Sequence, residues 1–320
     1  MAFSHGYGDT PSEEYAIDAI RSAHDFGCTF FDTAEGYGAQ QFFAGHNERI
    51  VGKAVASFRK DIVIATKFMF GGEACDGAEQ AAEIIRRHIM QSLKNLGTDY
   101  IDLYYLHRVS RQIPVETVAA AMRTFIDEGL IRGWGLSQVS GETLRRAHEV
   151  TPVSAVQNIY SMVERDCEKE VFPYAQSHGI GVVPFSPVAS GLLSGRVNAQ
   201  TDFSHADDVR KFVPQLSQQN INANKPLLDL LSDFAAKKNA TMAQISLSWM
   251  LAKYPNVVPI PGSRNKGRIL ENLGSWSVTL SPSEFDSLDT ALNAIQIHGH
   301  RGIEEFEGDT MRQWNREKQQ

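Results

Sequence analysis

Short apolar runs alternate with longer amphipathic segments along the chain, a pattern that predicts alternating strands and helices. The predicted strands are 28–33, 62–66, 101–106, 131–136, 154–157, 180–185 and 257–260. The predicted helices are 12–26, 47–57, 79–95, 114–128, 140–148, 167–178, 224–238, 241–253, 266–273 and 282–293. Ser140 and Thr241 are suitable N-caps for two of them. These repeated strand–helix units predict one α/β domain over residues 1–320 with a parallel sheet.

The number of predicted strands is one short of the closed barrel that such repeats usually form. A (β/α)8 TIM barrel needs eight strands, and the pattern predicts seven. The missing strand would precede the helix at 12–26, where Met1 to Pro11 read as a loop. We therefore expect a barrel that lacks its first strand, with two exposed sheet edges that lower stability or are covered by a partner or the tail.

Composition narrows the classes of partner. The chain has 31 Lys and Arg against 38 Asp and Glu, a formal net charge of −7, which argues against nucleic acid or an anionic membrane as a general partner. Cys28, Cys75 and Cys167 show neither zinc spacing nor a disulfide framework, as in a reducing compartment, so we expect a cytoplasmic protein. The N-terminus does not read as a signal peptide, and no apolar run is long enough to span a membrane.

Four polar residues follow the ends of predicted strands. Asp32, Lys67 and His107 each end or follow a strand, and Tyr37 lies in the loop after Asp32. In parallel strand–helix units these ends lie on one rim, where catalytic residues gather. Each residue alone has a structural alternative: an N-cap for Asp32, a surface lysine, a loop aromatic, and a core histidine. The placement of all four residues on one rim favours a shared catalytic site.

These four side chains suit the reduction of a carbonyl group, which needs a hydride on carbon and a proton on oxygen. A phenol has a reference pKa of about 10, and a neighbouring ammonium favours its phenolate form. Lys67 can supply that positive charge beside Tyr37, and Asp32 can orient Lys67. His107 can hydrogen-bond the substrate oxygen. General acid catalysis of this kind contributes about 10²–10⁴ in rate.

A basic segment after the last predicted strand suits a phosphate. No G-x-G-x-x-G follows a strand, so a Rossmann site is unsupported. The segment from Gly262 to Arg268 is P-loop-like, but Arg268-Ile269 stands where a P-loop requires Lys-Ser/Thr. It opens a helix after a strand, where barrels often bind phosphate. Arg264 and Arg268 add bidentate donors.

As an ordered set, the motifs resemble the aldo-keto reductase family over nearly the whole chain. They are Phe31-Asp32-Thr33-Ala34, Tyr37-Gly38, Asn47-Glu48, Ala65-Thr66-Lys67, Asp102 to His107, Gly135-Leu136-Ser137, Gln157-Asn158, Phe185-Ser186-Pro187, Ile260 to Arg264, and Glu271-Asn272. The resemblance implies an NADP-dependent oxidoreductase that reduces aldehydes and ketones, with Tyr37 as the acid. It implies that NADPH is favoured over NADH, with the adenosine 2′-phosphate bound at Arg264 and Arg268.

The resemblance also implies the rest of the cofactor site. Phe185 would stack on the nicotinamide ring, Ser137 and Gln157 would bind its carboxamide, and Glu271 and Asn272 would contact the adenine. The remaining cofactor residues it implies are Ser186, Pro187, Val188, Gly191, Leu193, Gly195, Pro261, Gly262 and Ser263. Gln138 stands where relatives often carry asparagine.

Several late residues have weaker interpretations. His298-Gly299-His300 resembles a metal pair, but no acidic partner is placed near it, and we interpret it as tail structure without a metal. Trp134 and Trp249 read as packing residues. Trp276 and Trp314 lie late in the chain, where C-terminal segments of this family can shape the substrate pocket.

Two alternatives to an active reductase remain open. The family contains channel-associated β subunits with the same fold and tetrad, so an NADPH-binding regulatory protein is one alternative. A degraded, weakly active barrel is the other, because of the missing strand. The expected partner in the leading interpretation is a small-molecule carbonyl substrate.

Overall fold

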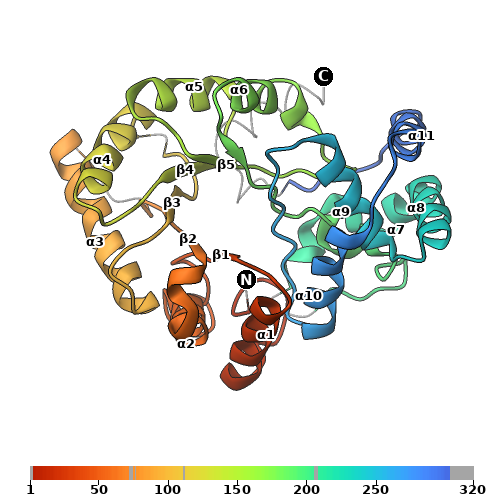
Figure 1. Cartoon of the computed structure of the whole chain (residues 1–320), viewed down its shortest axis with the longest axis horizontal. Helices are drawn as coiled ribbons and strands as arrows, with labels where there is room; N and C mark the ends of the chain where they lie inside the picture. Colours follow the sequence, from red (N-terminus) through yellow and green to blue (C-terminus); the bar gives the residue numbers. More distant parts are fainter. Residues whose placement is uncertain (1–2, 72–74, 76, 111, 205–207, 303–320) are drawn as a thin grey trace.

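A curved parallel sheet with helices on its outer side forms the frame of the chain (Figure 1). This computed structural model describes residues 3–71, 75, 77–110, 112–204 and 208–302. Six strands lie in the order β1-β2-β3-β4-β5-β6, all parallel to their neighbours. They are β1 (Phe30–Asp32), β2 (Val63–Phe68), β3 (Leu103–Leu106), β4 (Trp134–Ser137), β5 (Ala155–Gln157) and β6 (Gly181–Val182). The α/β prediction is confirmed.

The helices lie close to the predicted ranges, except α7, which was not predicted. They are α1 (Glu13–Asp25), α2 (His46–Val55), α3 (Ala78–Leu96), α4 (Val115–Asp127), α5 (Gly141–Val150), α6 (Val171–Ser177), α7 (Gln218–Ala223), α8 (Lys225–Lys238), α9 (Met242–Lys253), α10 (Lys266–Leu273) and α11 (Pro282–Asn293). The Ser140 side chain caps α5 by accepting from the Thr143 amide. Thr241 and Gln244 form a reciprocal capping box on α9. Both predicted N-caps are confirmed.

The predicted strand at 257–260 is wrong as a regular strand, although the segment does run beside β6. Val258 donates to the carbonyl of Val182 at 2.8 Å, and Ile260 donates to that of Pro184 at 3.1 Å. Only one bridge, Val182 to Val257, meets the strand definition. Pro259 within the segment carries no N–H and cannot donate to a ladder. Pro184 has the same effect on β6, which ends sooner than predicted.

The sheet of the described residues does not close on itself. No backbone hydrogen bond between those residues joins β1 to the 256–260 segment. The helix layer does cross this gap, because α1 packs beside α10 (Figure 1). The Tyr15 hydroxyl accepts from the Lys266 amide at 3.0 Å, and Lys266 Nζ pairs with Asp18 at 2.9 Å. The barrel predicted to lack its first strand therefore corresponds, in the described residues, to an open, curved sheet.

Residues 186–222, between the predicted strand at 180–185 and the predicted helix at 224–238, contain local helical structure. The described part of this segment holds three 3-10 helices, η3 (Ala189–Ser194), η4 (Val209–Phe212) and η5 (Pro214–Leu216), and then α7. Its Leu192 and Leu193 are fully buried in the core. The loop is therefore a packed part of the fold. Among the described residues, no helix combines the length and apolar character needed to cross a membrane.

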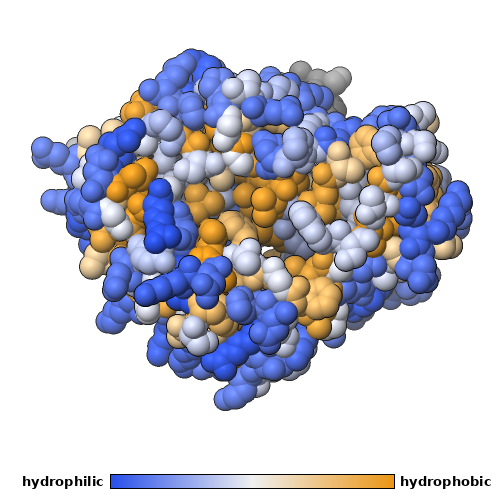
Figure 2. Space-filling view, viewed as in Figure 1, coloured by the Kyte–Doolittle hydropathy of each residue, from blue (hydrophilic) through white to orange (hydrophobic). Residues whose placement is uncertain are grey.

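Hydrophobic side chains gather over the sheet at the centre of the molecule. Figure 2 shows them in a hollow ringed by hydrophilic residues. Trp134 and Trp249 are both fully buried, which confirms their predicted packing role. Ala65, Leu103 and Tyr105 belong to a small separate cluster of buried residues. This packing fixes the strands whose ends carry the polar residues described next.

Candidate active site

Polar side chains occupy the carboxyl ends of five consecutive strands. Asp32 ends β1, Lys67 is the second-last residue of β2, and His107 directly follows β3. Ser137 and Gln157 end β4 and β5 and face each other in the register of the two strands. Since parallel strands end on one rim, the sequence prediction that these residues share a rim agrees with the fold.

A buried ion pair forms the base of the site. Lys67 Nζ contacts Asp32 Oδ1 and also donates to the carbonyl of Thr33 at 2.6 Å. Lys67 is fully buried and Asp32 is 5% exposed. Gln157 Nε2 donates to the other carboxylate oxygen of Asp32 at 2.8 Å. A buried pair is held favourably only when further hydrogen bonds satisfy its remaining atoms, as they do here.

The ring of Tyr37 lies among three nitrogen-bearing side chains. Lys67 Nζ is 5.4 Å from its centroid. The His107 ring meets it edge-on, with centroids 5.9 Å apart and an interplanar angle of 76°. His5 stacks on it at 4.9 Å with an interplanar angle of 13°. The structure thus brings together all four residues predicted as a catalytic set, and it adds His5.

His107 is held in its neutral form. Burial is the main cause that lowers its pKa well below the usual value of 6.5, and the positive charge of Arg108 and Lys67 and the neighbouring His5 act in the same direction. Its backbone amide donates to the Phe68 carbonyl at 2.8 Å, which fixes the start of the loop. A neutral imidazole can donate one N–H and accept at its other nitrogen.

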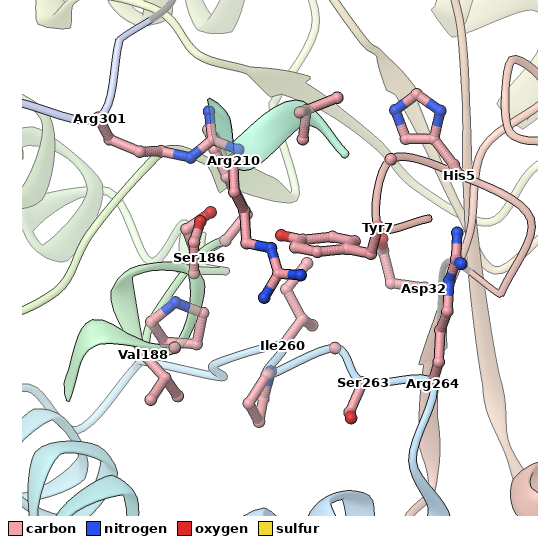
Figure 3. Close-up of a pocket in the computed structure, with 18 of the residues that line it drawn as sticks. His5, Tyr7, Asp32, Ser186, Val188, Arg210, Ile260, Ser263, Arg264 and Arg301 are labelled. Carbon is pink, nitrogen blue, oxygen red and sulfur yellow. The ribbon is translucent and has the colours of Figure 1, made fainter. Parts of the chain in front are cut away.

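A cavity of about 1190 Å³ opens at this rim. Such a volume exceeds the roughly 300–1,000 Å³ of typical small-molecule pockets and suits two ligands side by side. The predicted residues that line it are Asp32, Tyr37, His107, Ser137, Gln157, Phe185, Ser186, Pro187, Val188, Gly191, Pro261, Gly262, Ser263, Arg264, Arg268, Glu271 and Asn272. Figure 3 shows several of them pointing into the cavity from separate segments of the chain.

Two residues predicted for the cofactor lie behind the cavity wall instead. Leu193 is fully buried in the core. Gly195 has a φ of +68°, and a Cβ there would come within 2.6 Å of the Met242 sulfur. Leu193 packs the loop against the core. At position 195, the left-handed backbone and the tight contact favour glycine. Lys67 is also absent from the wall, since it lies buried beneath Tyr37.

The predicted phosphate segment presents unsatisfied donors. Arg264 Nη1 donates to the carbonyls of Gly8 and Asp9 at 2.6 and 2.5 Å. Its Nε and Nη2 are buried without a hydrogen-bond partner among the described residues. Burial lowers the pKa of this guanidinium, and Asp208 is the largest opposing influence. Buried donors are normally satisfied, so this position is suited to an anion that the protein itself does not provide.

Other predicted cofactor residues have partners within the protein. Ser137 Oγ accepts from Arg108 Nη1 at 3.1 Å. Glu271 forms an ion pair with Arg196 at 2.5 Å. Gln138 turns to a structural task, since its Oε1 accepts from the backbone amide of residue 159 at 3.1 Å. Any ligand that binds Ser137 or Glu271 must share or replace these contacts.

Sequence reasoning missed several residues of the cavity wall, including His5, Tyr7, Arg108 and Arg301. Arg108 carried a usable signal, because it directly follows His107 at a strand end. The other three lie in terminal segments with no periodic pattern, and only the tertiary fold brings them here.

The two late tryptophans do not add to the described site. Trp276 is 81% exposed and does not line the described cavity. Trp314 lies outside the described residues.

Comparisons with known proteins match the chain to one family. Residues 1–293 match the Aldo/keto reductase family. The chain is 35% identical over 315 residues to "Probable aldo-keto reductase 1" from Glycine max, covering 96% of this chain and 88% of that protein. The match therefore spans most of both proteins.

Solved structures give the same result. The glycerol dehydrogenase of Gluconobacter oxydans superposes with a TM-score of 0.80 at 26% identity, over 94% of this chain and 92% of that one. An aldo/keto reductase from Klebsiella pneumoniae, solved in complex with NADP and acetate, superposes with a TM-score of 0.68 at 25% identity, over 94% and 95% of the two chains.

Proposed function

The chain belongs to the aldo/keto reductase family, and from that membership we propose that it is an NADPH-dependent oxidoreductase that reduces aldehydes or ketones to alcohols. One observation carries the proposal: the Asp32–Lys67 pair lies buried beside the Tyr37 ring at the wall of a cavity large enough for a cofactor and a substrate. The neighbouring structures from Klebsiella pneumoniae that hold NADP and NADPH support the choice of cofactor.

The residues around Arg264 fit the phosphorylated end of NADPH. The buried and unpartnered Nε and Nη2 of Arg264 would bind the 2′-phosphate, with Arg268 beside it on α10. Asn265 caps α10 by accepting from the Arg268 amide at 3.0 Å, so the helix begins at this wall with its positive end toward the phosphate. Phe185 would face the nicotinamide ring, and Ser137 and Gln157 would orient its carboxamide. NADPH would supply the hydride.

Tyr37 is the proposed proton donor to the carbonyl oxygen. Once the proton leaves, the phenolate is stabilised by the positive charge of Lys67, which lies 5.4 Å from the ring centroid. Asp32 and the Thr33 carbonyl hold the ammonium group of Lys67 in place. A proton donor positioned in this way contributes about 10²–10⁴ in rate.

His107 is proposed to bind the carbonyl oxygen as a neutral N–H donor. Its pKa lies well below the usual value because of burial, so the imidazole carries no spare proton at neutral pH. That electrostatic state supports the proposal that Tyr37 is the acid and that His107 orients the carbonyl group. The edge-on arrangement of the two rings allows both to reach one substrate atom.

The test is a steady-state assay of NADPH oxidation with a panel of aldehydes and ketones, with the alcohol product measured by mass spectrometry. We expect one alcohol formed per NADPH consumed, and a lower kcat/KM with NADH. Tight NADPH binding without turnover of any carbonyl compound would contradict the proposal and favour the regulatory alternative.

A further inference from the structure

An arginine from the C-terminal segment faces the cavity and has no carboxylate partner among the described residues. Arg301 lines the cavity wall, and its Nε is buried with no hydrogen-bond partner among the described residues. It forms no salt bridge within that part of the chain either. A buried guanidinium donor without a partner costs free energy, so such a position is retained with least penalty when an anionic ligand binds to it.

The segment that carries Arg301 is seated by specific contacts. The side chain of Asn224, which is fully buried, donates to the carbonyl of His298 and accepts from its amide, both at 2.9 Å. The carboxylate of Glu164 accepts from the backbone amide of Arg301 at 2.5 Å. Gly299 has a φ of +75°, and a Cβ there would lie 2.9 Å from the Gln215 amide nitrogen. The His298–His300 motif therefore anchors the backbone that carries Arg301.

Arg301 lies close to the proposed reacting groups. Its guanidinium carbon is 5.8 Å from the centroid of Phe185, and that of Arg108 is 5.9 Å from the same ring. Burial and then the charges of Arg264 and Arg301 lower the pKa of His5, the residue stacked on Tyr37. Arg301 thus borders both the aromatic proposed for the nicotinamide and the surroundings of the proposed acid.

Arg264 and Arg301 enter the cavity from different sides. Figure 3 shows Arg301 and Arg264 on opposite sides of the cavity. Arg264 belongs to the proposed phosphate end of the cofactor, whereas Arg301 stands near Phe185, where the nicotinamide and the carbonyl carbon must meet. The position of Arg301 therefore suits a substrate better than the cofactor's 2′-phosphate.

We infer that the carbonyl substrate carries an anionic group, a carboxylate or a phosphate, and that Arg301 binds this group as a specificity-determining residue. The inference rests on the proposed reductase function, because it places the substrate between Phe185 and Tyr37. Charge-assisted hydrogen bonds to arginine are among the stronger protein contacts, and losing one typically changes affinity by about 10- to 100-fold.

The experiment compares matched charged and neutral substrates with the full chain. 4-Carboxybenzaldehyde is measured against its methyl ester, and glyceraldehyde 3-phosphate against glyceraldehyde, for the wild type, Arg301→Gln and Arg301→Lys. We expect the wild type to prefer one charged member at least about tenfold in kcat/KM, and Arg301→Gln to lose that preference by about 10- to 100-fold. Arg301→Lys keeps part of it, because the charge remains.

Controls separate this inference from the proposed function. Arg145→Gln, on the exposed face of α5, keeps the wild-type preference. If the protein reduces neutral aldehydes but shows no preference for charged substrates that depends on Arg301, the inference is overturned and the proposed function stands. The inference is also overturned if Arg301→Gln lowers the affinity for NADPH as much as it lowers kcat/KM for the charged substrate. If no carbonyl is reduced, the proposed function fails. Calorimetry of 4-(hydroxymethyl)benzoate against its methyl ester, on NADP⁺-loaded protein, then decides the inference by whether Arg301→Gln abolishes preferential binding of the acid.

A second variant tests the backbone segment that positions Arg301 rather than the charge of Arg301. Gly299→Ala places a Cβ against the Gln215 backbone and strains a left-handed φ. We expect a reduced preference for the charged substrate with kcat/KM for the neutral partner nearly unchanged. An unaltered preference in a folded Gly299→Ala protein would count against the role of the segment in aiming Arg301.

Discussion

Replacing Lys67 by methionine removes the cation from a buried ion pair while keeping the length of the side chain. Lys67 is fully buried, and its ammonium group contacts Asp32 and donates to the Thr33 carbonyl at 2.6 Å. In the variant, the Asp32 carboxylate stays buried and loses its ion pair, while the hydrogen bond from Gln157 remains. The change therefore affects both the stability of the fold and the stabilisation of the proposed Tyr37 phenolate.

The expected loss of stability follows from this burial. Two unit charges about 3 Å apart at an effective dielectric constant of about 20 attract by about 5 kcal/mol. Removing one member of a buried pair typically costs about 3–5 kcal/mol, since the other is left uncompensated. We expect Lys67→Met to lower the free energy of unfolding by that amount at pH 7. Replacing both members by neutral residues, as in Asp32→Asn/Lys67→Met, should recover most of the loss.

The assay is urea unfolding followed by fluorescence, combined with steady-state NADPH oxidation. The single variant should be the least stable of the three proteins. The double variant should regain stability but not activity, because the charge beside Tyr37 is still absent. A loss below about 1 kcal/mol in Lys67→Met, or a double variant no more stable than the single one, would refute the role of this pair as a buried, mutually compensating unit.

Three further outcomes are expected. Arg264→Ala should weaken NADPH much more than NADH in fluorescence titrations, and equal weakening would reject the 2′-phosphate role. His107 has a lowered pKa in the fold, so its contribution to stability is present above pH 6.5 and is lost as the pH falls below that value. In urea unfolding from pH 7.5 to 5, the free energy of unfolding should decline, and the decline should be smaller in His107→Gln. Trp276→Ser, at an exposed site, should leave kcat and KM unchanged, and a changed KM would indicate that this residue contacts the substrate.

The rim of the site was predictable because it depends on local signals. Strand ends can be read from short apolar runs, and Asp32, Lys67 and His107 stand directly at such ends. Parallel strands with short connections then place those ends together without further information. The buried ion pair between Asp32 and Lys67 is a consequence of that arrangement.

Other parts of the site depend on long-range packing that no local pattern encodes. His5 reaches Tyr37 and Arg301 reaches Phe185 only through the tertiary fold. The prediction of a regular strand at 257–260 was wrong because it relied on apolar content, whereas Pro259 interrupts the backbone hydrogen bonding of a strand. Leu193 fitted a family pattern for cofactor loops, but its side chain is buried in the core.

The most direct test of the central claim is single-turnover mixing of NADPH-loaded protein with a reducible aldehyde, using NADPH that carries deuterium at both nicotinamide C4 positions. The account predicts that one deuterium appears in the alcohol, and that Tyr37→Phe binds NADPH with nearly wild-type affinity yet transfers deuterium at least about 100-fold more slowly. Unchanged transfer in Tyr37→Phe, or an alcohol without deuterium, would contradict it.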